Sequence, residues 1–138
     1  MDILRFKTQH AEILEGINEL RRLSHAGVSA NAAAIAQRMT ELSSLVNRHL
    51  AVEDRILYPA VQNSPDPKIA DMGKAYQEEM TGIANAYIAF SRRWSAVASL
   101  RNDPDGFKQA ANTVLRTVYE RLQKENREFY PAVEAMQT

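Results

Sequence analysis

The sequence predicts an all-α protein: an antiparallel up-down-up-down four-helix bundle built from two similar helical hairpins. Apolar residues recur at steps of three and four along nearly the whole chain, and no stretch shows the two-residue alternation of a half-buried strand. Tracts rich in Pro, Asp and Asn at 63–67 and 102–106 interrupt this pattern. The halves at about 1–63 and 68–136 also resemble each other. With 138 residues and no cysteine, one hydrophobic core suffices to hold 1–138 as a single domain.

The first hairpin consists of two long helices. We expect the first helix over about 2–24, followed by Gly27, which suits a left-handed cap position. Its buried face carries residues at helical spacing, namely Phe6, His10, Ile13, Ile17 and Leu20. The second helix is expected from Ser29, as N-cap, to about Val61, because the prolines that follow lack backbone donors and end the helix.

The second hairpin repeats this plan. We expect a third helix over about 68–100 and a fourth helix that is capped by Asp103 or Asp105 and ends near Met136. Short connections between long helices place consecutive helices antiparallel, which gives the up-down-up-down topology.

Composition excludes several functions. The 17 basic residues balance the 17 acidic ones, and no run of Lys and Arg offers a patch to nucleic acid or to an anionic membrane. No apolar stretch approaches the ~20 residues that span a bilayer, and no signal-peptide pattern opens the chain, so we expect a cytoplasmic protein. The absence of cysteine excludes thiol catalysis and thiolate metal sites. No phosphate loop, nucleophile elbow or Ser-His-Asp pattern is present, and we do not expect an enzyme.

An internal repeat is the most informative feature of the sequence. The segment Glu53–Val61 (EDRILYPAV) matches Glu125–Val133 (ENREFYPAV) at a spacing of 72, with Glu, Arg, Tyr, Pro, Ala and Val repeated in place. At a spacing of 70 the apolar face of the first helix maps onto the third. One explanation of the repeat is the duplication of a good packing unit. Tyr-Pro would then merely end or bend the second helix of each hairpin, and the sequence leaves this explanation open.

Polar residues on the inward faces indicate a metal site. His10 lies on the buried face of the first helix, and His49 and Glu53 stand at i and i+4 on the second helix, where they point the same way. Nitrogen and oxygen ligands of this kind hold metals in helical bundles. By itself, however, a lone buried histidine is more often hydrogen-bonded within a core than bound to a metal.

These residues give the chain its resemblance to a known family. The pattern is His10, then His49-Leu-Ala-Val-Glu53 followed by Leu57-Tyr-Pro59, with a second-half echo of Glu125 and Phe129-Tyr-Pro131. It resembles the hemerythrin-like family, or HHE cation-binding domain. The resemblance implies a four-helix bundle around a non-haem di-iron centre with histidine ligands and two bridging carboxylates. It further implies that His10, His49, Glu53 and Glu125 are metal ligands.

The second half departs from that family pattern. Met80 stands where His10 maps, and Arg121 stands where His49 maps. A thioether is a weak ligand for such a site, and a guanidinium has no lone pair to give. Two hypotheses follow: one bound divalent ion and Arg121 together replace two metals, or Arg121 and the histidines replace both metals. Glu78 and Glu79, beside Met80, could supply an oxygen ligand, but an exposed pair is the favoured interpretation.

The resemblance and its departures predict a metal-binding or oxygen-, redox- or iron-sensing module with an incomplete di-iron site. Its cofactor would be iron or another divalent metal, as a single ion or not at all, and its ligand dioxygen or nitric oxide. Reversible oxygen carriage is disfavoured, because a one-metal site lacks the second iron that shares the electrons. The alternatives are a metal-free interaction or regulatory module in signalling, acting as a homodimer or with a protein partner, and a full di-iron protein with unconventional ligands.

Overall fold

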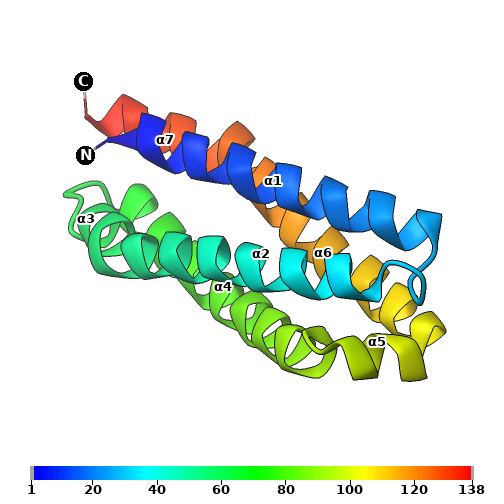
Figure 1. The fold of residues 1–138 in the computed structure, drawn as a ribbon. Coiled ribbons are helices and arrows are strands. Elements are labelled where there is room, and N and C mark those ends of the chain that lie inside the picture. The colour runs from blue at the N-terminus through cyan, green and yellow to red at the C-terminus, as the bar shows by residue number, and fades with distance from the viewer. Residues whose placement is uncertain (1, 138) are drawn as a thin grey trace.

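The computed structural model describes residues 2–137, which contain helices and no strand (Figure 1). The elements are α1 (Ile3–Ala26), α2 (Ala32–Val52), η1 (Glu53–Leu57), α3 (Tyr58–Gln62), α4 (Pro67–Trp94), α5 (Val97–Asn102), α6 (Pro104–Lys124), η2 (Glu125–Phe129) and α7 (Tyr130–Met136). The π-helical turns η1 and η2 join α2 to α3 and α6 to α7 without a break, so these segments form two continuous rods. The all-helical class is confirmed. The expected count of four helices is not confirmed, because the short helix α5 follows α4.

The long rods lie side by side and alternate in direction along the chain (Figure 1). Helix α1 packs on α2 and α6, and α4 packs on α2, α3 and α6. Both ends of the described chain and α3 lie at one end of the bundle, and α5 lies at the other (Figure 1). Residues that are far apart in sequence on α1, α2, α4 and α6 therefore face one shared interior.

The connection between the first two helices lies later in the chain than the sequence predicted. Helix α1 extends through Ala26, and Gly27 follows with a positive φ of 125° that favours glycine. Ser29 is not the N-cap of the next helix, because α2 begins at Ala32 with Asn31 before it. The side-chain amide of Asn31 instead donates to the Gly27 carbonyl over 2.9 Å, which holds the connection closed.

The third expected helix, over 68–100, is interrupted. Helix α4 ends at Trp94, and the backbone of Ala96 is extended. The hydroxyl of Ser95 donates to the Ser91 carbonyl, a bond that competes with continuation of the helix. The break turns α5 inward and buries Leu100 completely. Asp103 then caps α6 by accepting from the Gly106 amide over 2.9 Å, which selects Asp103 over Asp105 as the cap.

Each Tyr-Pro motif follows a π-helical turn. The amide of Tyr58 donates to the carbonyl of Glu53, five residues back, and Tyr130 bonds Glu125 in the same way. Proline at the next position cannot accommodate the ordinary i→i−4 bond, and a wider turn relieves that conflict. The i→i−5 bond also stacks residues five apart on one face of the rod, so the glutamate and the tyrosine of each motif both point inward.

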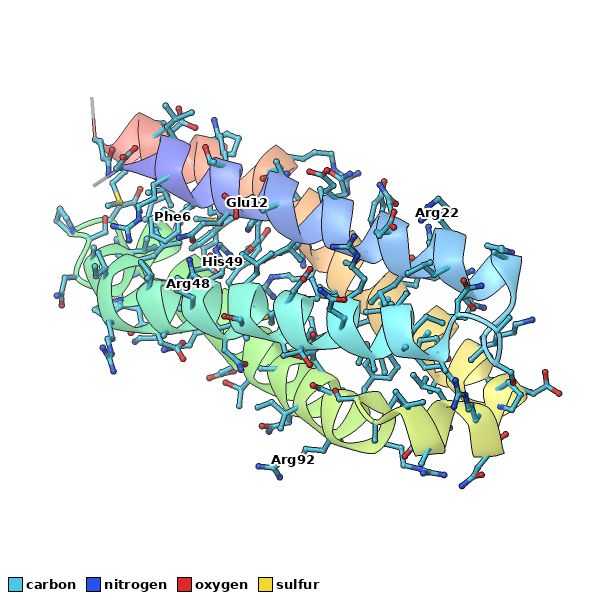
Figure 2. The ribbon with its side chains drawn as sticks, in the orientation of Figure 1. Phe6, Glu12, Arg22, Arg48, His49 and Arg92 are labelled. Atoms are coloured by element: carbon cyan, nitrogen blue, oxygen red, sulfur yellow. The ribbon has the colours of Figure 1, made fainter. Side chains whose placement is uncertain are left out.

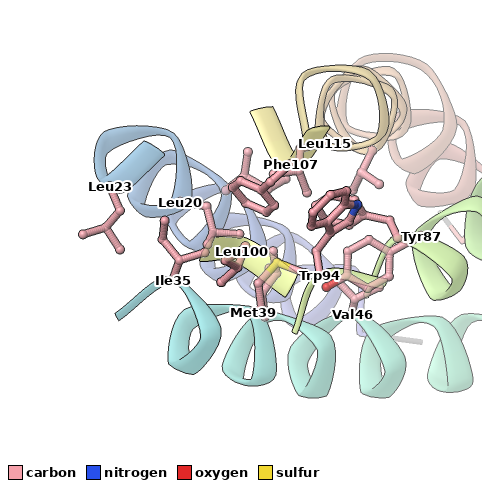
Figure 3. Close-up of a cluster of buried hydrophobic side chains, with 14 of the residues drawn as sticks. Leu20, Leu23, Ile35, Met39, Val46, Tyr87, Trp94, Leu100, Phe107 and Leu115 are labelled. Carbon is pink, nitrogen blue, oxygen red and sulfur yellow. The ribbon is translucent and has the colours of Figure 1, made fainter. Parts of the chain in front are cut away.

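Two apolar clusters form the core, and a polar layer separates them. The larger cluster fills the α5 end, where Trp94, Leu100 and Phe107 pack together (Figure 3). The smaller cluster fills the opposite end and includes Phe6 and Leu57. Between them, in the order of residues along each rod, lie the buried polar side chains: His10, His49, Glu53, Arg121 and Glu125.

The close approach of α3 and α4 requires a glycine. A Cβ atom on Gly73 would lie 2.8 Å from Cγ1 of Val61, whereas a Cβ atom on Gly82 in the same helix meets nothing within 4 Å. We expect Gly73→Ala to lower the free energy of unfolding by about 1–3 kcal/mol, because the rods must separate. The control Gly82→Ala should raise it by up to about 1 kcal/mol through helix propensity. Urea unfolding measures both, and equal stabilisation by the two changes would contradict this packing.

Candidate metal centre

The four side chains predicted as metal ligands lie together in the polar layer. One ligand atom from each of His10, His49, Glu53 and Glu125 lies within 4.8 Å of the other three, and all four residues are buried. Figure 2 shows His49 and Phe6 in the space between α1 and α2, with Arg22 and Arg92 extending outward. The ring centroids of Phe6 and His49 are 6.1 Å apart, so the smaller apolar cluster borders the site directly.

Both histidines are held from outside, with their Nε2 atoms turned inward. His10 Nδ1 lies 2.9 Å from Oδ1 of Asn126, and His49 Nδ1 lies 2.7 Å from Oε1 of Gln9. An Nδ1–H that donates to an amide oxygen leaves the lone pair on Nε2. The two Nε2 atoms are only 3.0 Å apart. Two lone pairs at this distance repel unless a proton or a metal ion lies between them.

Each carboxylate presents one oxygen to this space and keeps the other bonded. Oε2 of Glu53 accepts from the Tyr130 hydroxyl over 3.0 Å, and Oε2 of Glu125 accepts from the Tyr58 hydroxyl over 3.3 Å. Oε1 of Glu53 lies 3.0 Å from His49 Nε2, and Oε1 of Glu125 lies 3.1 Å from His10 Nε2. Neither Oε1 atom has a hydrogen-bond partner. Buried oxygens without partners are rare and costly, and either a proton or a cation in this space would satisfy them.

Arg121 brings a fixed positive charge to the same layer. It is 3% exposed, and its Nη2 donates to Oε2 of Glu125 over 3.3 Å and to the Tyr58 hydroxyl over 3.2 Å. The Tyr76 carbonyl accepts from Nη2 over 2.7 Å, and Glu79 accepts from Nη1 over 3.0 Å. Glu79 is half exposed, as expected, but it also anchors the buried guanidinium, which the sequence did not indicate. Met80 is buried and lines a cavity of about 20 Å³ with His49 and Arg121.

The charged groups oppose one another in the absence of a metal. Burial and the neighbouring charge of Glu125 raise the pKa of the Glu53 carboxyl well above its usual range. Burial works against ionisation of Glu125 as well, but His10 and the charge of Arg121 lower its pKa. Burial lowers the pKa of His49 to about 4, so this imidazole is neutral at pH 7. Without a metal, Glu125 is therefore ionised, and Glu53 is the group most inclined to keep a proton.

The residues fit one metal ion. Ligands at right angles around an ion, with bonds of about 2.1 Å, lie about 3.0 Å apart, and three separations in the cluster are 3.0, 3.0 and 3.1 Å. Two imidazole nitrogens and two carboxylate oxygens suit iron, manganese, cobalt or zinc. Where the family resemblance implies a second metal, the guanidinium of Arg121 donates to Glu125, and a guanidinium does not ligate a metal.

Two residues of the site were missed by sequence reasoning. Gln9 precedes His10 and binds the other histidine, His49, whereas Asn126 follows Glu125 and binds His10. Outer partners of this kind fix the orientation and basicity of metal-bound histidines. The one signal for Gln9 and Asn126 in the sequence is that each lies next to a predicted ligand. A residue next to a ligand on a helix lies at the edge of the face that carries the ligand.

Fold and site together define a helical-bundle protein with a buried cluster of two histidines and two glutamates that could hold a metal ion. Residues 1–133 match the model of the family described as hemerythrin HHE cation binding domain, and the chain belongs to this family. Neither the curated proteins nor the solved structures contain a match. None of the helices within residues 2–137 combines the length and the apolar character that crossing a membrane requires.

The raised pKa of Glu53 predicts a pH-dependent stability of the metal-free protein. The folded state holds the proton of the Glu53 carboxyl more tightly than the unfolded state does. The resulting stabilisation is fully present below the unfolded pKa and is lost as pH rises from there through the folded pKa. Between these two pKa values the wild type should lose up to about 1.4 kcal/mol of unfolding free energy per pH unit relative to Glu53→Gln. Urea unfolding in chelator from pH 5 to 9 measures the difference. A difference that does not change with pH would contradict the assignment.

Proposed function

We propose that the protein binds a single divalent metal ion, iron in the first instance, through His10, His49, Glu53 and Glu125. Arg121 provides the positive charge at the second position. The observation that carries this proposal is that the two carboxylate oxygens of Glu125 contact different groups. Oε1 faces His10, and Oε2 faces Arg121. A carboxylate placed in this way links one metal position to a guanidinium instead of linking two metals.

Charge balance supports a single ion. Two buried carboxylates and one guanidinium leave the layer with one net negative charge when both acids are ionised. A divalent ion converts this to one net positive charge, and a second divalent ion would raise it to three. Uncompensated charge in a low-dielectric interior costs several kcal/mol per ion, so the second ion is disfavoured. The unpartnered oxygens of Glu53 and Glu125 also favour an ion over a metal-free network.

We further propose a sensing role, with metal status or a diatomic ligand such as dioxygen or nitric oxide as the signal. Bound iron supplies a redox change and affinity for such ligands. The protein residues hold the ion away from water: Phe6 packs against His49, and Gln9 and Asn126 cover the outer nitrogens of the two imidazoles. A single iron surrounded in this way suits a reporter of binding or oxidation better than a carrier that needs two irons.

Metal analysis tests the stoichiometry. Protein supplied with ferrous iron without oxygen should contain one iron per chain. His49→Ala should abolish binding and with it the metal-dependent stabilisation, which is about 2.7 kcal/mol when the free ion is at 100 times its Kd. The control is His25→Ala, because His25 is exposed at the end of α1 and should leave binding unchanged. Two irons per chain, or none, would each refute the single-ion site.

A second prediction concerns the guanidinium. Arg121→Met should destabilise the protein by about 3–5 kcal/mol, because Glu125 loses its buried cationic partner. Arg121→His should raise the metal content above one per chain, because an imidazole then stands at the second position. The control is Arg116→His, on the exposed face of the same helix. Thermal unfolding and metal analysis measure the effects, and a fully stable Arg121→Met protein would show that the charge of Arg121 is not needed.

A further inference from the structure

The Tyr-Pro repeat has a role at the metal centre beyond bending the rods. We propose that Tyr58 and Tyr130 are positioning residues. Each hydroxyl binds the outer oxygen of the glutamate from the opposite half of the chain and so reserves the inner oxygen for the metal ion. The inference rests on the proposed single-ion site, which it deepens by stating how that site presents its two carboxylates.

The hydrogen bonds cross between the two rods. Tyr130, from the second half, donates to Oε2 of Glu53, from the first half, over 3.0 Å. Tyr58, from the first half, donates to Oε2 of Glu125, from the second half, over 3.3 Å. Both tyrosines are completely buried. In both glutamates it is Oε1, the atom without a hydrogen-bond partner, that lies beside a histidine Nε2.

The π-helical turns make this exchange possible. Five residues of an α-helix rotate a side chain by about 500°, which would leave the tyrosine well away from the direction of the glutamate. The i→i−5 bonds of η1 and η2 instead place Tyr58 above Glu53 and Tyr130 above Glu125. Each rod thus presents one carboxylate and one hydroxyl to the interior, and each hydroxyl serves the carboxylate of the facing rod.

The two hydroxyls differ in what else they contact. Tyr58 accepts from Nη2 of Arg121 over 3.2 Å, so its own proton is directed at Glu125. The Tyr130 oxygen lies 2.7 Å from His10 Nε2 as well as 3.0 Å from Glu53. If His10 Nε2 holds the ion, the lone pair of that nitrogen would be used, and Glu53 would be left as the acceptor for the Tyr130 proton. His10 would then direct the Tyr130 hydrogen bond to Glu53.

Each phenol has one proton to give. The Tyr58 hydroxyl donates it to Oε2 of Glu125, and the Tyr130 hydroxyl donates to Oε2 of Glu53.

Conservative variants separate positioning from packing. Tyr58→Phe and Tyr130→Phe keep the ring and remove only the hydroxyl, and Tyr87→Phe is the matched control. Tyr87 is also buried, but its hydroxyl bonds Ser43 outside the polar layer. With cobalt(II) as the probe ion, we expect the Kd to rise about 10–100-fold for Tyr58→Phe and Tyr130→Phe and to stay unchanged for Tyr87→Phe. The visible cobalt(II) spectrum should change only in the first two, because a freed Oε2 alters the coordination of the carboxylate.

The outcomes distinguish this inference from the proposed function. If the wild type binds no cobalt(II) or ferrous iron, both fail. If the wild type binds and both site variants match Tyr87→Phe in Kd and spectrum, only the positioning role fails. A tyrosinate-to-iron(III) charge-transfer band that disappears in Tyr130→Phe would make this residue a ligand and would also overturn the role. Should a variant not fold, the infrared carboxylate stretches of the loaded wild type decide: one-oxygen coordination is expected, and two-oxygen coordination refutes the inference.

Discussion

Two carboxylates in a buried layer impose the constraint on which the rest of the site depends. Glu53 and Glu125 are fully buried, and their nearest oxygens share one space with two imidazole nitrogens. Like charges at this distance cannot both persist in a low-dielectric interior without a cation. The guanidinium of Arg121 supplies one positive charge, and it reaches Glu125 but forms no hydrogen bond with Glu53 among the described contacts. The remaining charge on Glu53 is the reason that a proton or a metal ion is needed.

The position of Arg121 is determined by more than its attraction to Glu125. The Tyr76 carbonyl and Glu79 accept from the two ends of its fork, and the Tyr76 ring lies 4.6 Å from its central carbon. Because these contacts fix the guanidinium of Arg121 from several sides, its positive charge has a defined position, as the charge of a bound metal has. Unlike a metal, the guanidinium is permanently charged and forms no bond with an exogenous ligand. In the proposed single-ion site, Arg121 would therefore keep the electrostatic role of a second cation without its chemistry.

Sequence reasoning found what periodicity and the repeat encode. The three-and-four spacing identified the buried faces, and the match between Glu53 and Glu125 identified both acids and, by register, the position of Arg121. It did not find Gln9 and Asn126, because polar amides beside a ligand look like ordinary surface residues in a sequence, and their partial burial follows only from the packing of the rods. The break after Trp94 was missed for a related reason: Ser95 suits a helix or a turn, and the burial of Leu100 decides between them.

The polar layer is difficult to explain by stability alone. It separates two apolar clusters that could otherwise form one continuous core, and replacing a buried ion pair by apolar packing is often neutral or stabilising. Three of its buried polar atoms, Oε1 of Glu53, Oε1 of Glu125 and Nε of Arg121, have no hydrogen-bond partner. The two oxygens are unpartnered where the histidine lone pairs converge, whereas the other oxygen of each acid accepts a hydrogen bond from a tyrosine. The inward-facing oxygens are thus left free while the outward-facing ones are hydrogen-bonded, a difference that core packing does not explain. This difference supports the proposed ion.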